Sequence, residues 1–256
     1  MRYFVTFSYD GSPFHGWQRQ PNARSVQQVM EEAFSLILSE PVELTAAGRT
    51  DAGVHARMMV AHFDLHADKI LSEEESSRLV ARLNSYLDAA IAIRTIVPVK
   101  KDAHARFDAM SRTYHYHVID HKDPFLNGYA MRLQPGLDYE KMNEAAALLH
   151  DTDDFASFCK VHTDVKTTLC KVTEAKWVKA TEEGHYVFII TADRFLRNMV
   201  RAVVGTLLDV GRGKMTIAQF GQVITQKHRT AAGESVPAAG LFLEKIEYDW
   251  DKIGYQ

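Results

Sequence analysis

The segment VELTAAGRTDAGVHARMMVAHFDL, residues 42–65, holds a glycine-flanked loop between two strand-like runs, residues 42–46 and 58–65. Gly48 and Gly53 let this loop take backbone conformations that other residues resist, and they let a ligand approach the main chain closely. Asp51 lies at its centre, and no other carboxylate occurs within seven residues on either side. The segment therefore predicts two strands joined by a loop that presents one carboxylate.

The spacing of the loop leaves two interpretations of Asp51 open. An Arg-x-Asp turn often forms a local salt bridge or an Asx-turn, which would make Asp51 a structural residue. A carboxylate held on a glycine-flanked loop above a sheet could instead act as a nucleophile or a base.

Outward from the loop, the first part of the chain alternates strands and helices. Ser25 is predicted to cap the first helix in a capping box with Gln28, and the three glutamates after Ser72 favour the start of the second. The predicted strands and helices cover residues 3–9, 26–38, 42–46, 58–65, 72–87 and 91–99. This β-α-β-β-α-β order is the ferredoxin-like, or split βαβ, arrangement.

The second part of the chain repeats this order without obvious sequence identity. Its predicted elements are a strand at 112–119, a helix at 139–149, a hairpin of 169–179 and 186–192, helices at 195–210 and 217–228, and a strand at 240–248. We therefore predict an α+β protein of two ferredoxin-like, RRM-like halves with joined antiparallel sheets. The predicted domains are residues 1–103 and 104–256.

The bulk composition is that of an ordinary globular protein. Of the 256 residues 46% are hydrophobic and 25% are charged, and the formal net charge is −3. No apolar run is long enough to span a membrane, and the N-terminus does not read as a signal peptide. Two cysteines without CxxC spacing fit a cytoplasmic protein with free thiols. The charge argues against a general nucleic-acid binder but permits a local basic cleft.

Several histidines are candidate metal ligands. His55, His62 and His66 could supply ligands together with Asp51 or Asp64. No HExxH pairing and no CxxC spacing accompanies them, so we predict that the protein has no metal site.

Arg194, Arg197 and Arg201 have the spacing of one side of a helix. Such a row could form a solvated basic face or a phosphate-binding edge. One of its arginines could instead point inward at a carboxylate. Arg201 lies in an apolar run, where a buried charge needs a partner. Tyr114 and Tyr116 share a predicted strand, either as core aromatics or as a ring on which a base stacks.

The loop resembles the signature of the TruA family of tRNA pseudouridine synthases, and five further motifs resemble that family in the same order. They cover residues 9–20, 104–109 and 112–116, 154–158, 199–201 and 237–241. The resemblance implies the pseudouridine synthase fold with a basic cleft, and a homodimer that binds the anticodon arm of tRNA. It also implies isomerisation of uridines in the anticodon stem-loop, at tRNA positions 38, 39 and 40, without a metal or an organic cofactor.

The resemblance also implies roles for individual residues. Asp51 would be the catalytic aspartate, Arg201 its partner, and Tyr114 the ring that stacks on the target base. Leu241 would help to wall the uracil pocket. Arg49 and Arg106 would face the RNA.

The implied reaction breaks the N1–C1′ bond of uridine and forms a C5–C1′ bond, so no atom is gained. Asp51 could attack C1′, attack C6 or remove the 2′ proton, and either Asp51 or Tyr114 could accept the C5 proton. Two rival functions are a non-catalytic split βαβ RNA-binding module and a metal-dependent hydrolase built on the histidines.

Overall fold

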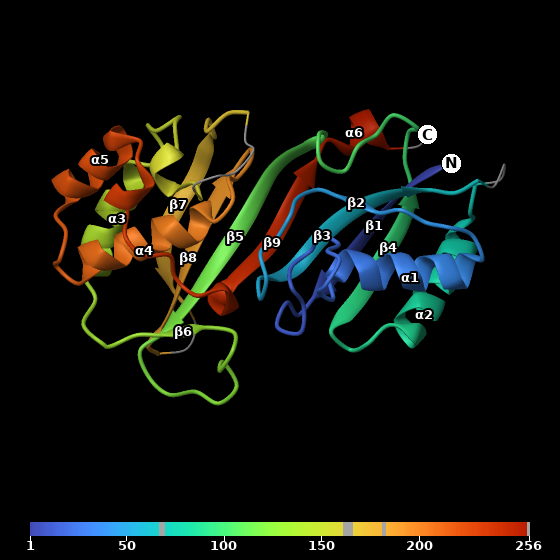
Figure 1. Cartoon of the computed structure of the whole chain (residues 1–256), viewed down its shortest axis with the longest axis horizontal. Coiled ribbons are helices and arrows are strands. Elements are labelled where there is room, and N and C mark those ends of the chain that lie inside the picture. The colour runs from blue at the N-terminus through green and yellow to red at the C-terminus, as the bar shows by residue number, and fades with distance from the viewer. Residues whose placement is uncertain (67–69, 161–165, 181–182, 255–256) are drawn as a thin grey trace. The chain divides into compact units, whose positions relative to one another are not determined.

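The computed structural model describes residues 1–66, 70–160, 166–180 and 183–254. These residues form two compact units, Met1–Met110 with Leu243–Gln256, and Ser111–Phe242. The described parts hold six α-helices and nine mainly antiparallel strands, so the fold is mixed α/β (Figure 1). The predicted domains count the last strand wholly with the second half, whereas from Leu243 onward it clusters with the first unit.

The first unit has the strand order β4-β1-β3-β9, with β2 paired to β3. Val5 in β1 lies opposite Ala61 in β3 and Ile96 in β4, and both pairings are antiparallel. The elements of this unit are β1 (Arg2–Tyr9), α1 (Val26–Leu38), β2 (Thr45–Ala46), β3 (His55–Asp64), α2 (Glu73–Tyr86), β4 (Ile91–Pro98), β9 (Leu241–Tyr248, its first two residues counted with the other unit) and α6 (Trp250–Ile253).

Both long helices of the first unit begin where the sequence predicts a helix start. Ser72 and Glu75 form the full reciprocal capping box of α2. Ser25 caps α1 by accepting a hydrogen bond from the backbone N–H of Gln28. The side chain of Gln28 binds Glu32 instead of returning to the cap, so the predicted capping box of α1 is only half formed.

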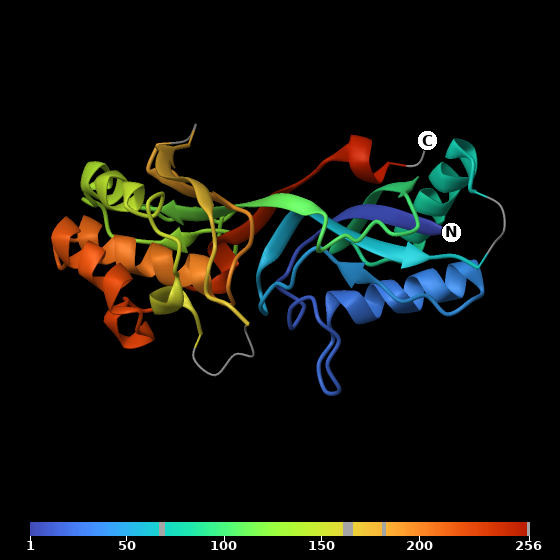
Figure 2. The same cartoon turned by 90° about the horizontal axis from the view of Figure 1, so that it is seen from above.

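The two helices lie side by side in the first unit (Figure 1). Figure 2 shows α1, the long blue helix, running along one face of this unit's strands. Its apolar side packs there, with Phe34 meeting the ring of Phe63 edge-on at a centroid distance of 5.0 Å. A side chain of α2 also forms hydrogen bonds with β4. The amide of Asn84 accepts from the N–H of Ile93 and donates to its carbonyl.

The predicted strand at 42–46 is much shorter than expected, since only Thr45 and Ala46 pair with β3. The residues before them bind side chains of α1 in place of a neighbouring strand. The N–H of Val42 donates to Ser35, and the N–H of Leu44 donates to Glu31. The predicted strand is therefore wrong for residues 42–44, where the backbone donors of Val42 and Leu44 bind a helix and not a neighbouring strand.

The second unit has the strand order β5-β8-β7, with the short β6 parallel to β5. Three of its helices, α3, α4 and α5, pack against one another (Figure 1). Its elements are β5 (Ala109–Ile119), β6 (Met131–Arg132), α3 (Tyr139–Ala147), a 3-10 turn (Ala156–Phe158), β7 (Val172–Lys179), β8 (His185–Ala192), α4 (Met199–Gly211), α5 (Ile217–Gln226) and two further 3-10 turns (Arg229–Ala231 and Ala238–Gly240).

The helix predicted over 195–210 begins four residues late. Asn198 has a positive φ of 67°, a left-handed conformation that an α-helix cannot contain, and α4 starts directly after it. Arg194 lies before the helix and donates to the carbonyls of Thr167 and Leu169. The predicted row of three arginines along one helix is therefore wrong, because only Arg201 belongs to α4.

None of the helices in the described parts of the chain is both long and apolar enough to cross a membrane.

Candidate functional site

The loop of residues 47–54 that carries Asp51 leaves the sheet of the first unit at a fixed point. The N–H of Ala47 donates to the carbonyl of Val60 at 2.8 Å, which extends the pairing of β2 with β3 by one bond. Within the loop, the N–H of Val54 donates to the carbonyl of Asp51 at 3.1 Å. The side chain of Asp51 is half-buried, whereas that of Arg49 is exposed. The loop thus has a tight turn of its own around the carboxylate.

The segment after β1 lies directly against this loop. The N–H of Trp17 donates to the carbonyl of Thr50 at 3.2 Å, and the hydroxyl of Thr50 bonds to that of Tyr9 at 2.8 Å. Gly16 has a φ of +86°, and a Cβ placed on it would lie 2.5 Å from the Thr50 carbonyl oxygen. Only glycine fits this position without a shift, because the backbone of residue 16 touches the residue before Asp51.

Arg106 belongs to a turn that is fastened to β3. The N–H of Ala105 donates to Nδ1 of His62 at 3.1 Å, and the N–H of Arg106 donates to Nδ1 of His104 at the same distance. Burial, assisted by the nearby charge of Arg2, lowers the pKa of His62 to about 4, so its ring is neutral and able to accept this bond. The exposed guanidinium of Arg106 lies over the ring of Phe107, 5.7 Å from its centroid.

The two tyrosines of β5 lie in different surroundings, although both were expected on one strand. Tyr114 is half-buried, and its ring meets Phe195 edge-on at 5.0 Å. Tyr116 is fully buried and donates its hydroxyl proton to the carbonyl of Pro237 at 2.9 Å. Burial raises the pKa of Tyr116. Tyr116 is thus a core residue, and Tyr114 is the tyrosine of this pair with an accessible ring.

Arg201 is fixed by the main chain that follows the 3-10 turn Arg229–Ala231. Its Nε donates to the carbonyl of Val236 at 2.7 Å, and the N–H of Val236 donates back to the carbonyl of Arg201 at 3.2 Å. Ser235 accepts side-chain hydrogen bonds from Asn198 and Arg229, which holds this segment along α4. Leu241, the first residue of β9, is buried. We call residues 229–237 the α4 strap.

The predicted site residues divide between the two units. Asp51, Arg49 and Arg106 belong to the first, with Asp51 and Arg49 on one loop; Tyr114, Arg201 and Leu241 belong to the second. Their catalytic and binding roles stay predictions. Across the described ranges, no three side chains of His, Cys, Asp or Glu gather as metal ligands would.

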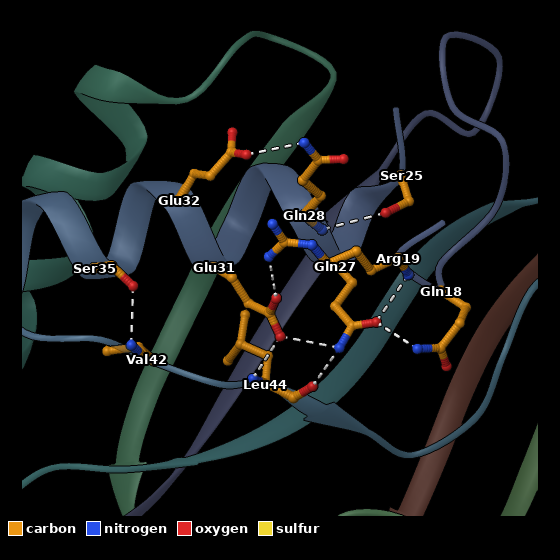
Figure 3. A network of polar contacts seen from close by, with 10 residues as sticks. All are labelled: Gln18, Arg19, Ser25, Gln27, Gln28, Glu31, Glu32, Ser35, Val42 and Leu44. Atoms are coloured by element: carbon orange, nitrogen blue, oxygen red, sulfur yellow. Dashed lines mark hydrogen bonds and ion pairs between the residues drawn. The ribbon is translucent and has the colours of Figure 1, made fainter. Parts of the chain in front are cut away.

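The sequence reasoning missed the residues that hold the Asp51 loop. Gln27 and Glu31 lie four residues apart on α1. They belong to a polar network that binds Leu44, just before β2 and the Asp51 loop, and the segment of residues 17–19 (Figure 3). Their i, i+4 spacing was a signal, but it also fits an ordinary solvated helix pair such as Gln28 and Glu32.

Comparison with known proteins gives consistent matches. The profile of a family described as tRNA pseudouridine synthase matches residues 5–108 and 145–249. A protein of Porphyromonas gingivalis named tRNA pseudouridine synthase A is 54% identical over 250 residues, covering 98% of both chains. Proteins of the same name are 51% identical in Bacteroides thetaiotaomicron, over 98% of this chain and 91% of the relative, and 40% identical in Bacillus licheniformis, over 97% and 100%.

Proposed function

The chain belongs to the tRNA pseudouridine synthase family and is an isomerase acting on tRNA, and we propose that it converts uridines of the anticodon stem-loop, at positions 38, 39 and 40, to pseudouridine. The observation that carries the proposal is the family match over both parts of the chain, which includes the Asp51 loop. The structure supports it with a single half-buried carboxylate on a loop with a tightly packed backbone.

The reaction asks three things of the protein, and we assign one predicted residue to each. A carboxylate must act on the nucleotide as an anion, which is the role proposed for Asp51. A cation must stabilise that ionised form, and we assign this role to Arg201. A hydrogen bond from its Nε to the carbonyl of Val236 orients the guanidinium. An aromatic ring must hold the target base outside the helix, which we assign to the accessible ring of Tyr114.

The remaining site residues are proposed to bind RNA. Arg49 and Arg106 are exposed and carry the positive charge that a phosphate backbone attracts. Leu241 is buried at the start of β9 and would supply an apolar wall for the uracil ring. Base flipping costs a few kcal/mol, and stacking on Tyr114, about 1–3 kcal/mol per base, would offset much of it.

The architecture and assembly implied by the resemblance also belong to this proposal. In the first unit the order β1, α1, β2, β3, α2, β4 supports a ferredoxin-like half, and β5, α3, β7, β8 and α4 give a second unit of related order. We propose that residues 1–103 and 104–256 are the two domains, and that a homodimer acts in the cytoplasm. Light scattering tests the assembly, since an active monomer at working concentration would contradict it.

The activity is tested on an unmodified tRNA transcript with uridine at positions 38, 39 and 40. We expect the protein alone to convert these uridines, and sequencing after a chemical reaction specific for pseudouridine locates them. A control transcript that carries cytidine at the three positions should stay unconverted. Conversion only outside the anticodon arm would contradict the proposed target, and no conversion anywhere would contradict the proposed activity.

A further inference from the structure

The side chain of Gln27 forms a junction between two parts of the chain that meet at the Asp51 loop. Its amide makes four hydrogen bonds. The nitrogen donates to Glu31 Oε1 at 2.9 Å and to the carbonyl of Leu44 at 3.1 Å, while the oxygen accepts from Gln18 Nε2 at 2.9 Å and from the N–H of Arg19 at 3.0 Å (Figure 3). An amide has two donors and two acceptor positions, so this side chain is fully used.

Glu31 also binds Leu44, the residue before β2 and the Asp51 loop. Its side chain is buried, and Oε1 accepts from the N–H of Leu44 at 3.0 Å as well as from Gln27. The other oxygen faces the guanidinium of Arg19 at 3.3 Å. Leu44 therefore has both its N–H and its carbonyl bound by α1, just before the chain enters β2 and the loop.

The same junction reaches the loop by a second route. The backbone N–H of Gln27 donates to the carbonyl of Trp17 at 3.0 Å, and the N–H of Trp17 donates to the carbonyl of Thr50. Thr50 directly precedes Asp51. One helical turn thus fixes the chain at residue 44, upstream of the carboxylate, and at residue 50, next to it.

We infer that Gln27 and Glu31 are positioning residues for Asp51: they touch no substrate, and their side chains set the place of the catalytic carboxylate through Leu44 and through Arg19, two residues after Trp17. This inference rests on the proposed function. A misplacement of about 1 Å at a reacting group can slow a reaction roughly 100-fold, so a loosened loop would show in the rate of the chemical step.

A matched pair of substitutions separates this role from ordinary packing. Gln27→Met keeps the length of the side chain and removes its four hydrogen bonds. Gln28→Met makes the same change on the next residue of the same helix, where only the bond to Glu32 is lost (Figure 3). A further control is Asn84→Leu, which removes a comparable bond pair between α2 and β4, away from the loop.

The measurement is the single-turnover rate constant of pseudouridine formation, with enzyme in saturating excess over tRNA. As long as the folded enzyme still saturates the tRNA, an inactive fraction lowers neither the rate constant nor the end point, so partial unfolding alone leaves the result unchanged. We expect Gln27→Met to slow this rate constant about 10- to 100-fold with tRNA affinity within about twofold of wild type. Gln28→Met and Asn84→Leu should keep the wild-type rate constant, and Asn84→Leu should lower the melting temperature.

Substitutions of Glu31 give the conservative rescue. Glu31→Ala should slow the reaction as Gln27→Met does, whereas Glu31→Gln keeps an oxygen that can accept from Leu44 and should recover most of the rate. If Gln27→Met does not fold by circular dichroism, Gln27→Asn replaces it with the same expectation.

The inference is overturned if the folded Gln27 variant reacts at the wild-type rate, or if the Gln27 and Gln28 variants slow equally. Its failure differs from failure of the proposed function, because in the first case wild type still forms pseudouridine and in the second it forms none.

Discussion

Asp51 and Arg201 are held in place by different kinds of contact. The Asp51 loop depends on side chains and close approaches from distant parts of its unit: Gln27 and Glu31 at its root, and the backbone of Gly16 and Trp17 against Thr50. Arg201 is held by the main chain of Val236 on both sides. A main-chain contact survives most substitutions of the residue that provides it, while a side-chain contact does not.

This difference predicts unequal sensitivity. Substitutions around the Asp51 loop should slow the reaction even when they lie far from the carboxylate in sequence. Substitutions in the α4 strap should lower stability and leave the reaction rate nearly unchanged, because the main chain of Val236 still binds Arg201.

Among substitutions that leave Asp51 and Arg201 themselves unchanged, the largest effect is expected from Gly16→Ala. The added Cβ would lie 2.5 Å from the carbonyl oxygen of Thr50, so the loop beside Asp51 must move. We expect a loss of about 100-fold or more in kcat/KM, measured by tritium release from C5-labelled uridine in tRNA. Gly213→Ala is the control, because Gly213 also has a positive φ, +71°, but open space at its Cβ. Both variants carry a backbone strain of about 1–2 kcal/mol. Equal activity in the two would show that the contact with Thr50 does not cause the loss.

Arg201→Lys tests the other side of the comparison. Lysine keeps the positive charge but has no Nε to bind Val236, so the cation loses its fixed direction. We expect a fall of about tenfold in turnover. Turnover of Arg201→Lys equal to that of wild type in the tritium assay would contradict this role.

Ser235→Ala removes an acceptor shared by two side chains, that of Asn198 just before α4 at 2.6 Å and that of Arg229 in the strap at 2.9 Å. We expect a loss of about 1–2 kcal/mol in the free energy of unfolding, because hydrogen-bonding groups are left unmatched. Turnover should stay within about twofold of wild type, since Val236 still binds Arg201 through its main chain. Denaturant unfolding and the tritium assay measure the two effects, and a large loss of turnover at unchanged stability would break the comparison.

The smallest effect concerns acid stability. The pKa of His62 is lowered to about 4 in the fold, so the unfolded chain binds more protons between pH 6.5 and pH 4. The stability that the neutral ring contributes above pH 6.5 is therefore lost as the pH falls through this window. In His62→Gln an amide oxygen can accept from Ala105 without titrating. Between these pH values its melting temperature, followed by calorimetry, should fall a few °C less than that of wild type. An equal fall in the two proteins would show that His62 does not cause the loss of stability in acid.

The sequence predicted the order of the elements well because burial patterns are local. The alternation of residues 3–9 and the helix start at Ser72 both correspond to observed elements. It failed where the partner of a segment decides its structure. Residues 42–44 look like a strand, yet their backbone donors bind α1, and Asn198 takes a left-handed conformation that the apolar pattern around it does not reveal.

The site could be predicted only in part for the same reason. The glycine-flanked Asp51 stands out in the sequence because its loop is local. Gln27 and Glu31 do not, since their pairing is like that of Gln28 and Glu32 on the same helix. What distinguishes them is that Leu44, 13 residues from Glu31, lies beside them in the fold.

The central claim, that the carboxylate of Asp51 carries the reaction, is tested most directly by Asp51→Asn. The amide keeps the shape of the side chain and removes its charge. We measure tritium released from C5-labelled uridine in tRNA, together with tRNA binding by the same preparation. The account predicts binding close to wild type and no detectable release of tritium. Substantial release by the Asp51→Asn protein would contradict it.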